Sequence, residues 1–246
     1  MKLIINADDF GFSESINNGI IDAYKEGLIS STTIMINMPY AEDAIQRWKE
    51  NSGLGLGLHI NLTQGSPISN NVSSLVDENN TFHKHRKVEN EQVEITYEDA
   101  YTEIKAQIDK LLSYKVEIDH LDTHHFIHLN PSIRKALTTL AKEYNLPLRT
   151  MDDDFRKKVK SLGIKTPDIF SFDFYDEGAS WETIANFVEK YKGSNSIEIL
   201  THCGYIDEDT KKRTGYILRE VELNELRKLK DNSFYKEYPL SKYSDL

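Results

Sequence analysis

Histidine is concentrated in one short stretch of this 246-residue sequence. The segment HLDTHHFIH at 120–128 holds four of the eight histidines, with an aspartate among them. Imidazole and carboxylate groups are side chains that hold divalent ions in proteins, so the stretch predicts a metal site. If the segment is a strand, its side chains alternate between two faces. His120, Asp122 and His124 then share one face, and His125 lies on the other.

A turn in the chain would change this arrangement. If the backbone turns after Thr123, His124 and His128 could lie one helical turn apart, as ligand pairs on helices do. The next helix start comes too late along the chain for that geometry. We therefore favour His124 as the metal ligand, with His128 near the site and His125 packing or binding substrate.

Other ionisable side chains also fall where predicted strands end. Because the carboxyl ends of parallel strands in a barrel meet at one face, these side chains and His124 would converge on one pocket. A divalent ion there would take His59, His124 and one carboxylate, leaving open positions for water and substrate. The other strand-end residues are Asp8, Asp9, His59, Asp122, Arg149 and His202.

Several of the candidate residues also have an ordinary structural explanation. Asp8 and Asp9 could form a turn in which the carboxylates bond the backbone, which is the commoner fate of such pairs. His59 could be a core histidine with its hydrogen bonds satisfied. His83 and His85, in the polar stretch TFHKHRK, are expected to be solvated surface residues.

The elements that position these residues follow an alternating pattern. Short apolar strands alternate with helices, which predicts parallel strands joined by right-handed crossovers and an α/β fold. An open doubly wound sheet and a (β/α) barrel both fit six or seven such units. Residues 63–95 interrupt this alternation of strands and helices, and their composition predicts a long loop or lid. We expect strands at 2–7, 30–37, 55–62, 116–123, 146–150 and 196–202. We expect helices after Ser13 or Ser15, after Pro39 and Thr96, from Pro131 to Asn145, and over 180–192 and 218–229.

Composition narrows the class of protein further. The net charge is −10 and the pI about 5.3, which makes nucleic acid a poor partner. The single cysteine, Cys203, excludes an internal disulfide and is expected to be a small buried residue. No glycine-rich G-x-G-x-x-G follows the first strand, which argues against a dinucleotide site. The N-terminus predicts no signal peptide and no apolar run has the length of a membrane span, so we expect a cytoplasmic protein.

Five motifs together give the sequence a resemblance to a known family. In order along the chain, they resemble the motifs of the YdjC-like, or ChbG-like, carbohydrate deacetylases. The resemblance implies a single-domain distorted (β/α) barrel over residues 1–246, often a homodimer. It also implies removal of acetyl groups from N-acetylated sugars such as chitooligosaccharides, with a divalent ion, usually Mg²⁺. The motifs are NADDFG (6–11), STTIMIN (31–37), GLHINLTQGSP (57–67), HLDTHHFIHLNP (120–131) and THCGY (201–205).

The resemblance assigns roles by position. The metal histidines of the family match His59 and His124, and Asp9 would supply the third ligand. Asp8 could then act as general base, because a nearby cation keeps its carboxylate ionised. His202 could protonate the leaving amine as general acid.

Three features bear on these assignments. Relatives tend to have proline after the late histidine, where this sequence has Cys203, so the loop that aims His202 is less stiff. Arg149 could orient a carboxylate and is expected, together with His125 and His128, among the substrate-binding residues. Two histidine ligands would suit Zn²⁺ better than Mg²⁺, although the resemblance implies Mg²⁺.

Two rival functions remain open from the sequence. A glycosidase acting on disaccharide phosphates would need two carboxylic groups flanking the bond and no metal. The protein could instead be a sugar-binding protein that has the same pocket but no catalytic activity. The strand-end histidines argue against the glycosidase, and the full set of candidate catalytic residues argues against the silent binder.

Overall fold

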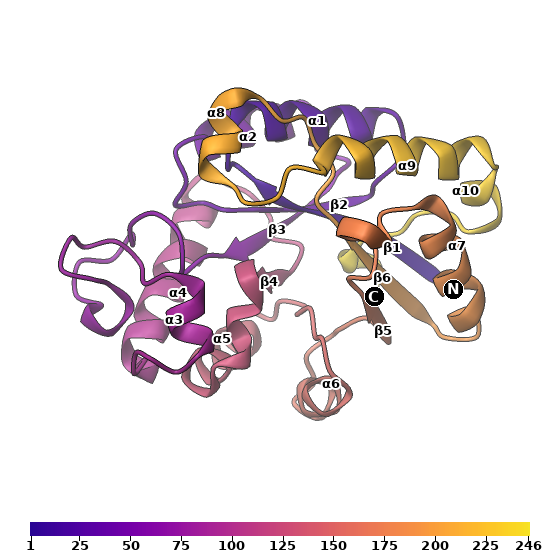
Figure 1. The fold of residues 1–246 in the computed structure, drawn as a ribbon. Helices are drawn as coiled ribbons and strands as arrows, with labels where there is room; N and C mark the ends of the chain where they lie inside the picture. Colours follow the sequence, from indigo (N-terminus) through magenta and orange to yellow (C-terminus); the bar gives the residue numbers. More distant parts are fainter.

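Six parallel strands form a single curled sheet in the computed structural model, which describes residues 1–246. The sheet order is β4-β3-β2-β1-β6-β5, and every pairing between neighbours is parallel. The sheet curls into an open half-barrel with helices around it (Figure 1), which confirms the predicted distorted (β/α) barrel. The strands are β1 (Lys2–Phe10), β2 (Ser31–Ile34), β3 (Gly55–Ile60), β4 (Leu121–Thr123), β5 (Ile169–Ser171) and β6 (Ser196–Thr201).

Ten α-helices surround the sheet. In Figure 1, α1, α2 and α9 cover its upper side, α4 and α5 lie at the lower left, and α7 lies at the right. The helices are α1 (Glu14–Lys25), α2 (Ala41–Lys49), α3 (His85–Glu89), α4 (Tyr97–Ser113), α5 (Pro131–Glu143), α6 (Asp153–Ser161), α7 (Trp181–Tyr191), α8 (Glu208–Arg213), α9 (Arg219–Asp231) and α10 (Phe234–Glu237). None of them is long and apolar enough to cross a bilayer.

Capping side chains start the helices where the sequence predicts. Ser13 accepts a hydrogen bond from the backbone N–H of Ile16 at the start of α1. Thr96 and Asn130 cap α4 and α5 in the same way, which satisfies donors that have no partner within a helix. These caps fix the points at which the chain leaves the sheet and turns back along it.

The strands are buried on both faces of the sheet, which explains their short apolar sequences. All six residues of β3 and of β6 are buried, as expected for parallel strands covered by helices. The buried apolar side chains form one cluster of 54 residues, which includes Cys203. The prediction for Cys203 as a buried residue is therefore confirmed, whereas the single domain over 1–246 stays a prediction.

The fifth strand lies elsewhere than predicted. Residues 146–150 form no strand, and only one bridge, between Leu148 and Leu121, joins them to β4. The carbonyl of Pro147 accepts from the N–H of Leu121, but a proline has no N–H with which to extend the ladder. The fifth strand of the sheet is β5, three residues in a polar stretch that carries no strand pattern.

The insertion at 63–95 contains little regular structure, in agreement with its prediction as a long loop. It holds a 3₁₀ turn at Ser73–Leu75 and the short helix α3. The expectation that His83 and His85 are solvated surface residues is wrong, because both are half-buried. The ring of His85 lies 4.4 Å from that of His125, so the insertion packs against the segment that follows β4.

Candidate metal centre

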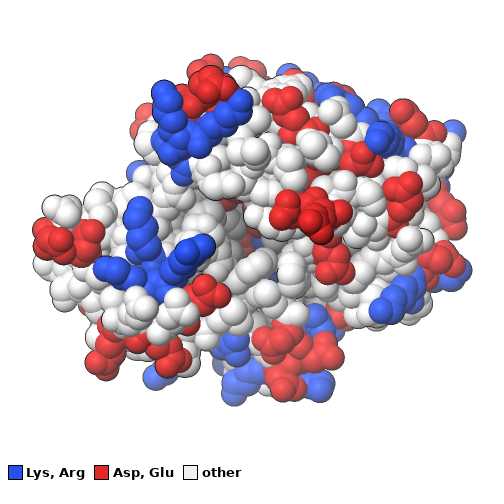
Figure 2. All heavy atoms as spheres, viewed as in Figure 1, with Lys and Arg blue, Asp and Glu red and all other residues white.

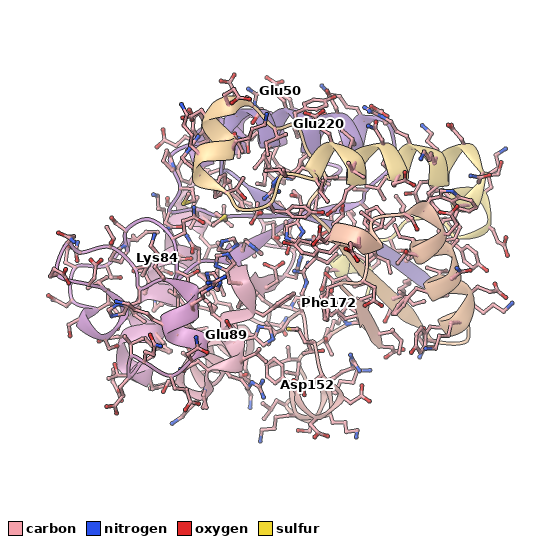
Figure 3. The ribbon with its side chains drawn as sticks, in the orientation of Figure 1. Glu50, Lys84, Glu89, Asp152, Phe172 and Glu220 are labelled. Atoms are coloured by element: carbon pink, nitrogen blue, oxygen red, sulfur yellow. The ribbon has the colours of Figure 1, made fainter.

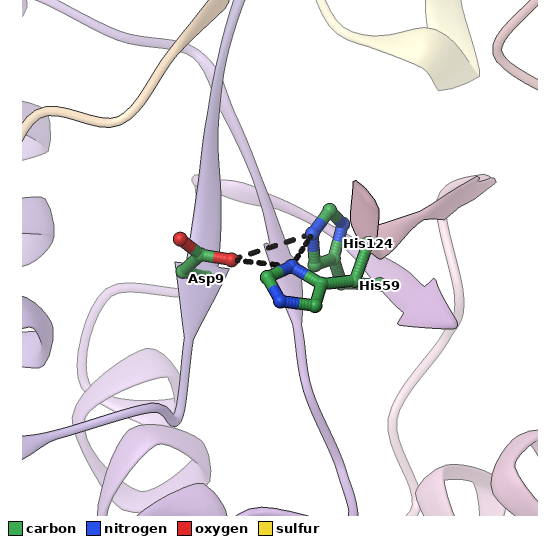
Figure 4. Close-up of side chains that lie close together, drawn as sticks. All are labelled: Asp9, His59 and His124. Atoms are coloured by element: carbon green, nitrogen blue, oxygen red, sulfur yellow. Dashed lines mark hydrogen bonds and ion pairs between the residues drawn. The ribbon is translucent and has the colours of Figure 1, made fainter. Parts of the chain in front are cut away.

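Three buried side chains bring their donor atoms together at the carboxyl ends of β1 and β3 and just after β4. Oδ1 of Asp9 lies 3.4 Å from Nε2 of His59 and 3.2 Å from Nδ1 of His124. The two histidine nitrogens are 3.3 Å apart, so the three atoms form a nearly equilateral triangle (Figure 4). The site residues predicted as metal ligands therefore meet at one point.

The backbone at the end of β1 aims the two aspartates. The pairing of β1 with β2 shifts register between Ala7 and Phe10, and Asp9 has a φ of +72°. A bulge of this kind re-aims side chains, and it is found often beside active sites. A non-glycine residue in the left-handed region is strained, so the surrounding contacts must hold Asp9 in place.

The donor atoms fit a divalent ion. Oδ1 of Asp9 is buried and accepts no hydrogen bond, although a buried carboxylate oxygen normally has a partner. Two neutral imidazole nitrogens and one carboxylate oxygen are a common ligand set for transition metals. Tetrahedral bonds of about 2.0–2.1 Å place ligand atoms roughly 3.3–3.4 Å apart, close to the edges of this triangle. Octahedral bonds of the same length would place adjacent ligands about 2.8–3.0 Å apart.

A carboxylate behind His59 fixes the orientation of its ring. Nδ1–H of His59 donates to Oδ1 of Asp122 over 2.7 Å, which leaves Nε2 pointing toward Asp9 and His124. Thr33 donates to the other oxygen of Asp122 over 3.0 Å. Metal-bound histidines usually have such a carboxylate behind them, and it sets the tautomer.

The two histidines differ in charge. Burial alone would lower the pKa of His59, but the carboxylates of Asp122 and Asp8 raise it to about 10. Burial lowers the pKa of His124, which stays neutral at pH 7. Without an ion, His59 therefore carries a proton that competes for the ligand position.

Asp8 is held by an arginine beside the triangle. Nη1 and Nη2 of Arg149 donate to its two oxygens over 2.8 and 2.9 Å, and Asn6 donates to Oδ1 over 2.8 Å. Burial alone would raise the pKa of Asp8, but Arg149 and His59 hold it well below its usual range. The carboxylate is thus ionised at pH 7, and its Oδ2 lies 4.0 Å from Nε2 of His59.

Arg149 contacts protein carboxylates and is 1% exposed. Besides Asp8, it donates to Asp122 over 2.7 Å and to Glu198 over 2.8 Å. The structure therefore places Arg149 behind Asp8, on the side away from solvent, and not among residues open to a substrate. The buried position of Arg149 follows from the tertiary structure, because buried carboxylates on three strands need one shared cation.

His202 follows β6 and is half-buried between two tyrosines. Its ring lies 5.4 Å from that of Tyr175 and 5.5 Å from that of Tyr216. Burial, together with Arg219, lowers the pKa of His202 to about 4, so the ring is neutral at pH 7. The N–H of Cys203 donates to Oγ1 of Thr201 over 3.1 Å, a bond that proline could not make.

The predicted alternation of the duplicated histidines is wrong. β4 ends at Thr123, and His125 and Phe126 take left-handed conformations with φ of 55° and 51°. The ring of His125 therefore lies 3.7 Å from that of His124, on the same side of the sheet, with its Nδ1 3.0 Å from Oγ1 of Thr63.

His128 lies deeper than its neighbours. It is 2% exposed, its Nδ1 lies 2.6 Å from Oγ1 of Thr123, and its ring stacks on Phe155 at 5.6 Å. These contacts are those of a packing residue near the site, and burial lowers the pKa of His128 to about 3.

Comparison with known proteins identifies the family to which this chain belongs. A model of the family described as YdjC-like protein matches residues 2–238. The chain belongs to the YdjC-like family. A protein of Listeria monocytogenes named carbohydrate deacetylase is 36% identical over the full length of both chains. One of the same name from Clostridium beijerinckii is 39% identical, covering 90% of this chain and 89% of that one.

Solved structures show the same fold. A protein of Enterococcus faecalis named for cellobiose-phosphate cleavage is 31% identical, with a TM-score of 0.90 and coverage of 99% of this chain and 98% of that one. A peptidoglycan N-acetylglucosamine deacetylase shares the fold at 14% identity, with a TM-score of 0.53 and coverage of 98% and 85%.

Several polar contacts of this YdjC-like site were not predicted from the sequence. Asp122 stands in the histidine-rich motif, but nothing marks it as the partner of His59. Glu198 could have been noticed, because a carboxylate within a buried strand must find a cation or a donor. Arg219 donates to Oδ2 of Asp9 from α9, far from any strand end, so no local pattern predicts it.

Proposed function

We propose that this protein is a metal-dependent hydrolase that removes the acetyl group from N-acetylated sugars of the chitooligosaccharide type. The observation that carries the proposal is the buried triangle of Asp9, His59 and His124, with the ionised carboxylate of Asp8 beside it. Relatives named carbohydrate deacetylase, matched over 89% or more of their length, support the same reaction.

The residues present fit the requirements of amide hydrolysis. A divalent ion held by Asp9, His59 and His124 would polarise the amide carbonyl and make a water molecule more acidic. Asp8 would accept the proton of the attacking water, since Arg149 and His59 keep its carboxylate ionised. Its low pKa makes Asp8 a weak base, which suits a water already acidified.

His202 would supply the proton for the leaving amine. Its pKa of about 4 means that the ring is neutral in the free protein at pH 7. It must therefore take up a proton during the reaction, either the one that Asp8 removes from the attacking water or one from solvent, before it can give one to the amine. Its Nδ1 is buried without a partner, which leaves that atom free for such a transfer.

The donor set and its spacing favour Zn²⁺ over Mg²⁺. Mg²⁺ prefers oxygen ligands and an octahedral arrangement, whereas two imidazole nitrogens suit Zn²⁺. The family resemblance implies Mg²⁺, so both ions belong in the test.

Exposed aromatic rings support a sugar as the substrate. Phe172 is 47% and Tyr175 is 41% exposed, and both lie within ring contact of site segments. Phe172 contacts Phe126 at 5.6 Å, and Tyr175 contacts His202 at 5.4 Å. Phe172 lies between the two halves of the molecule in Figure 3. Aromatic faces are suitable surfaces for the apolar faces of sugar rings.

Basic side chains gather at the rim of the same face. Figure 2 shows two blue clusters on either side of a hollow, over α3 and α8, although the net charge is −10. Lys211 and Arg213 are paired with Glu208 and Asp209 within α8. We therefore propose that the basic side chains at α3 hold a phosphate group on the sugar, and the substrate screen includes phosphorylated forms. The basic residues of these two segments are Lys84, Arg86, Lys87, Lys211, Lys212 and Arg213.

The rival glycosidase has less support. It needs one ionised and one protonated carboxyl group on opposite sides of an accessible bond. The two ionised aspartates are adjacent in sequence and paired with arginines. Glu222 has a pKa raised by burial to about 7, but its side chain is fully buried against Thr201 and Tyr216.

An acetate-release screen tests the proposal directly. The substrates are N-acetylglucosamine and its β-1,4-linked dimer, each with and without a 6-phosphate, in the presence of Zn²⁺, Mg²⁺ or Mn²⁺. We expect acetate from at least one sugar, abolished by a chelator and restored by the ion. Asp8→Asn should lower turnover about 10²-fold or more while the ion stays bound. No acetate from any sugar, with sugar binding intact, would favour the silent binder.

A further inference from the structure

The C-terminal segment, residues 239–246, reaches the opposite end of the sheet from the metal centre. Leu240 forms a parallel bridge with Leu3 near the start of β1, and the N–H of Ser241 donates to the carbonyl of Leu3 over 2.7 Å. The N–H of Ser244 donates to Asp119 over 2.7 Å. Tyr243 lies between these anchors in the sequence and is fully buried.

We propose that Tyr243 is a positioning residue for Asp8, acting through a buried chain of hydrogen bonds that runs through Glu198 and Arg149. The inference rests on the proposed function, because it assigns Tyr243 to the base of that reaction.

A stacked histidine fixes the ring of Tyr243. The rings of His120 and Tyr243 are 3.7 Å apart and nearly parallel, at 4°. His120 lies against Gly57 of β3, where a Cβ would approach the imidazole to 2.5 Å, so glycine leaves the space for it. Both ring nitrogens of His120 lack hydrogen-bond partners, and burial holds its pKa well below the usual value. His120 is therefore a flat, neutral support and not a metal ligand.

The hydroxyl of Tyr243 begins the chain of hydrogen bonds. It donates to Oε2 of Glu198, and Oε1 of the same carboxylate accepts from Nε of Arg149 over 2.8 Å. The other end of the guanidinium holds both oxygens of Asp8, at 2.8 and 2.9 Å. All four side chains are almost completely buried, so water cannot replace a missing partner.

Loss of the hydroxyl would act on Asp8 through these contacts. Oε2 of Glu198 would be left as a buried carboxylate oxygen without a donor. Glu198 would then move, or take up a proton, and hold Arg149 less firmly. Arg149 is shared by Asp8, Asp122 and Glu198, so a change at one end of the guanidinium shifts the other. The geometry of Asp8 would therefore loosen without any change at the substrate face.

The alternative is that Tyr243 only packs. Tyr243→Phe separates the two roles, since phenylalanine keeps the stacked ring and removes the hydroxyl. Tyr238→Phe is a matched control, because the hydroxyl of Tyr238 also contacts a glutamate, Glu189, at the surface over 3.1 Å. We expect Tyr243→Phe to lower kcat about tenfold with KM within about twofold of the wild type, and Tyr238→Phe to change neither.

A second variant keeps the inference falsifiable if Tyr243→Phe does not fold. Glu198→Gln should give the same selective loss of kcat, and in the double variant the two losses should not add. A folded Tyr243→Phe enzyme with the kcat of the wild type would overturn the inference. So would losses of the two single variants that multiply in the double variant.

An NMR measurement separates failure of this inference from failure of the proposed function. The Nε–H of Arg149, bonded to Glu198, should exchange slowly with water in the wild type and much faster in Tyr243→Phe. If the wild type releases no acetate, the proposed function fails, yet this exchange still tests the chain. Unchanged exchange in Tyr243→Phe would overturn the inference whatever the activity.

Discussion

Metal binding should release a proton from His59. Nε2 of this residue is a corner of the ligand triangle, and the carboxylates of Asp122 and Asp8, acting against burial, raise its pKa to about 10. An ion must displace that proton. At pH 7 the competition lowers the apparent affinity by about 10³, or about 4 kcal/mol, relative to a neutral ring. Asp9 and His124 add no proton, because the pKa of each is lowered.

The affinity for the metal ion should therefore increase with pH. His59 is protonated below about pH 10, so raising the pH removes the competing proton and favours binding of the ion. The apparent affinity for the ion should rise about tenfold per pH unit between pH 6 and 8. Isothermal titration of the metal-free protein with Zn²⁺, in buffers of different ionisation enthalpy, measures the protons released. We expect about one proton per ion at pH 7. An affinity independent of pH, with no proton released, would refute the reasoning about His59.

Three further outcomes are expected. His125→Ala should keep its bound ion in elemental analysis, because its ring nitrogen contacts Thr63 and not the ligand triangle. Glu222→Gln should remove a pH dependence of stability: burial raises the pKa of Glu222 to about 7, so its contribution is greatest in acid and weakens by about 2 kcal/mol from pH 5 to 7. Urea unfolding of both proteins at the two pH values measures this difference. Phe172→Ala should raise KM for a disaccharide about fivefold and leave KM for the monosaccharide nearer the wild type.

The convergence of these strand-end residues on one pocket could be predicted, because it follows from the topology. Parallel strands bring their carboxyl ends to one face, so correct strand ends were enough to bring His59, His124 and the aspartate pair together, whereas the choice of Asp9 as the ligand came from the family resemblance. The apolar runs of β1, β3 and β6 and the capping residues mark those ends in the sequence.

The surroundings of the ligands depend on contacts that no local pattern encodes. The left-handed backbone at His125 and Phe126 turns a strand into a tight turn, and neither residue type signals it. The pairing of Asp9 with Arg219 joins residues 210 positions apart. The position of Arg149 behind Asp8 follows from three buried carboxylates that only the folded chain brings together.

The central claim is that Asp9, His59 and His124 hold one divalent ion. Elemental analysis of purified wild type, His59→Ala and His124→Ala, with circular dichroism to confirm folding, tests it most directly. We expect about one ion per chain in the wild type and a small fraction of that in both variants, because each removes one of three protein ligands. Equal metal content in the wild type and in both folded variants would contradict the account.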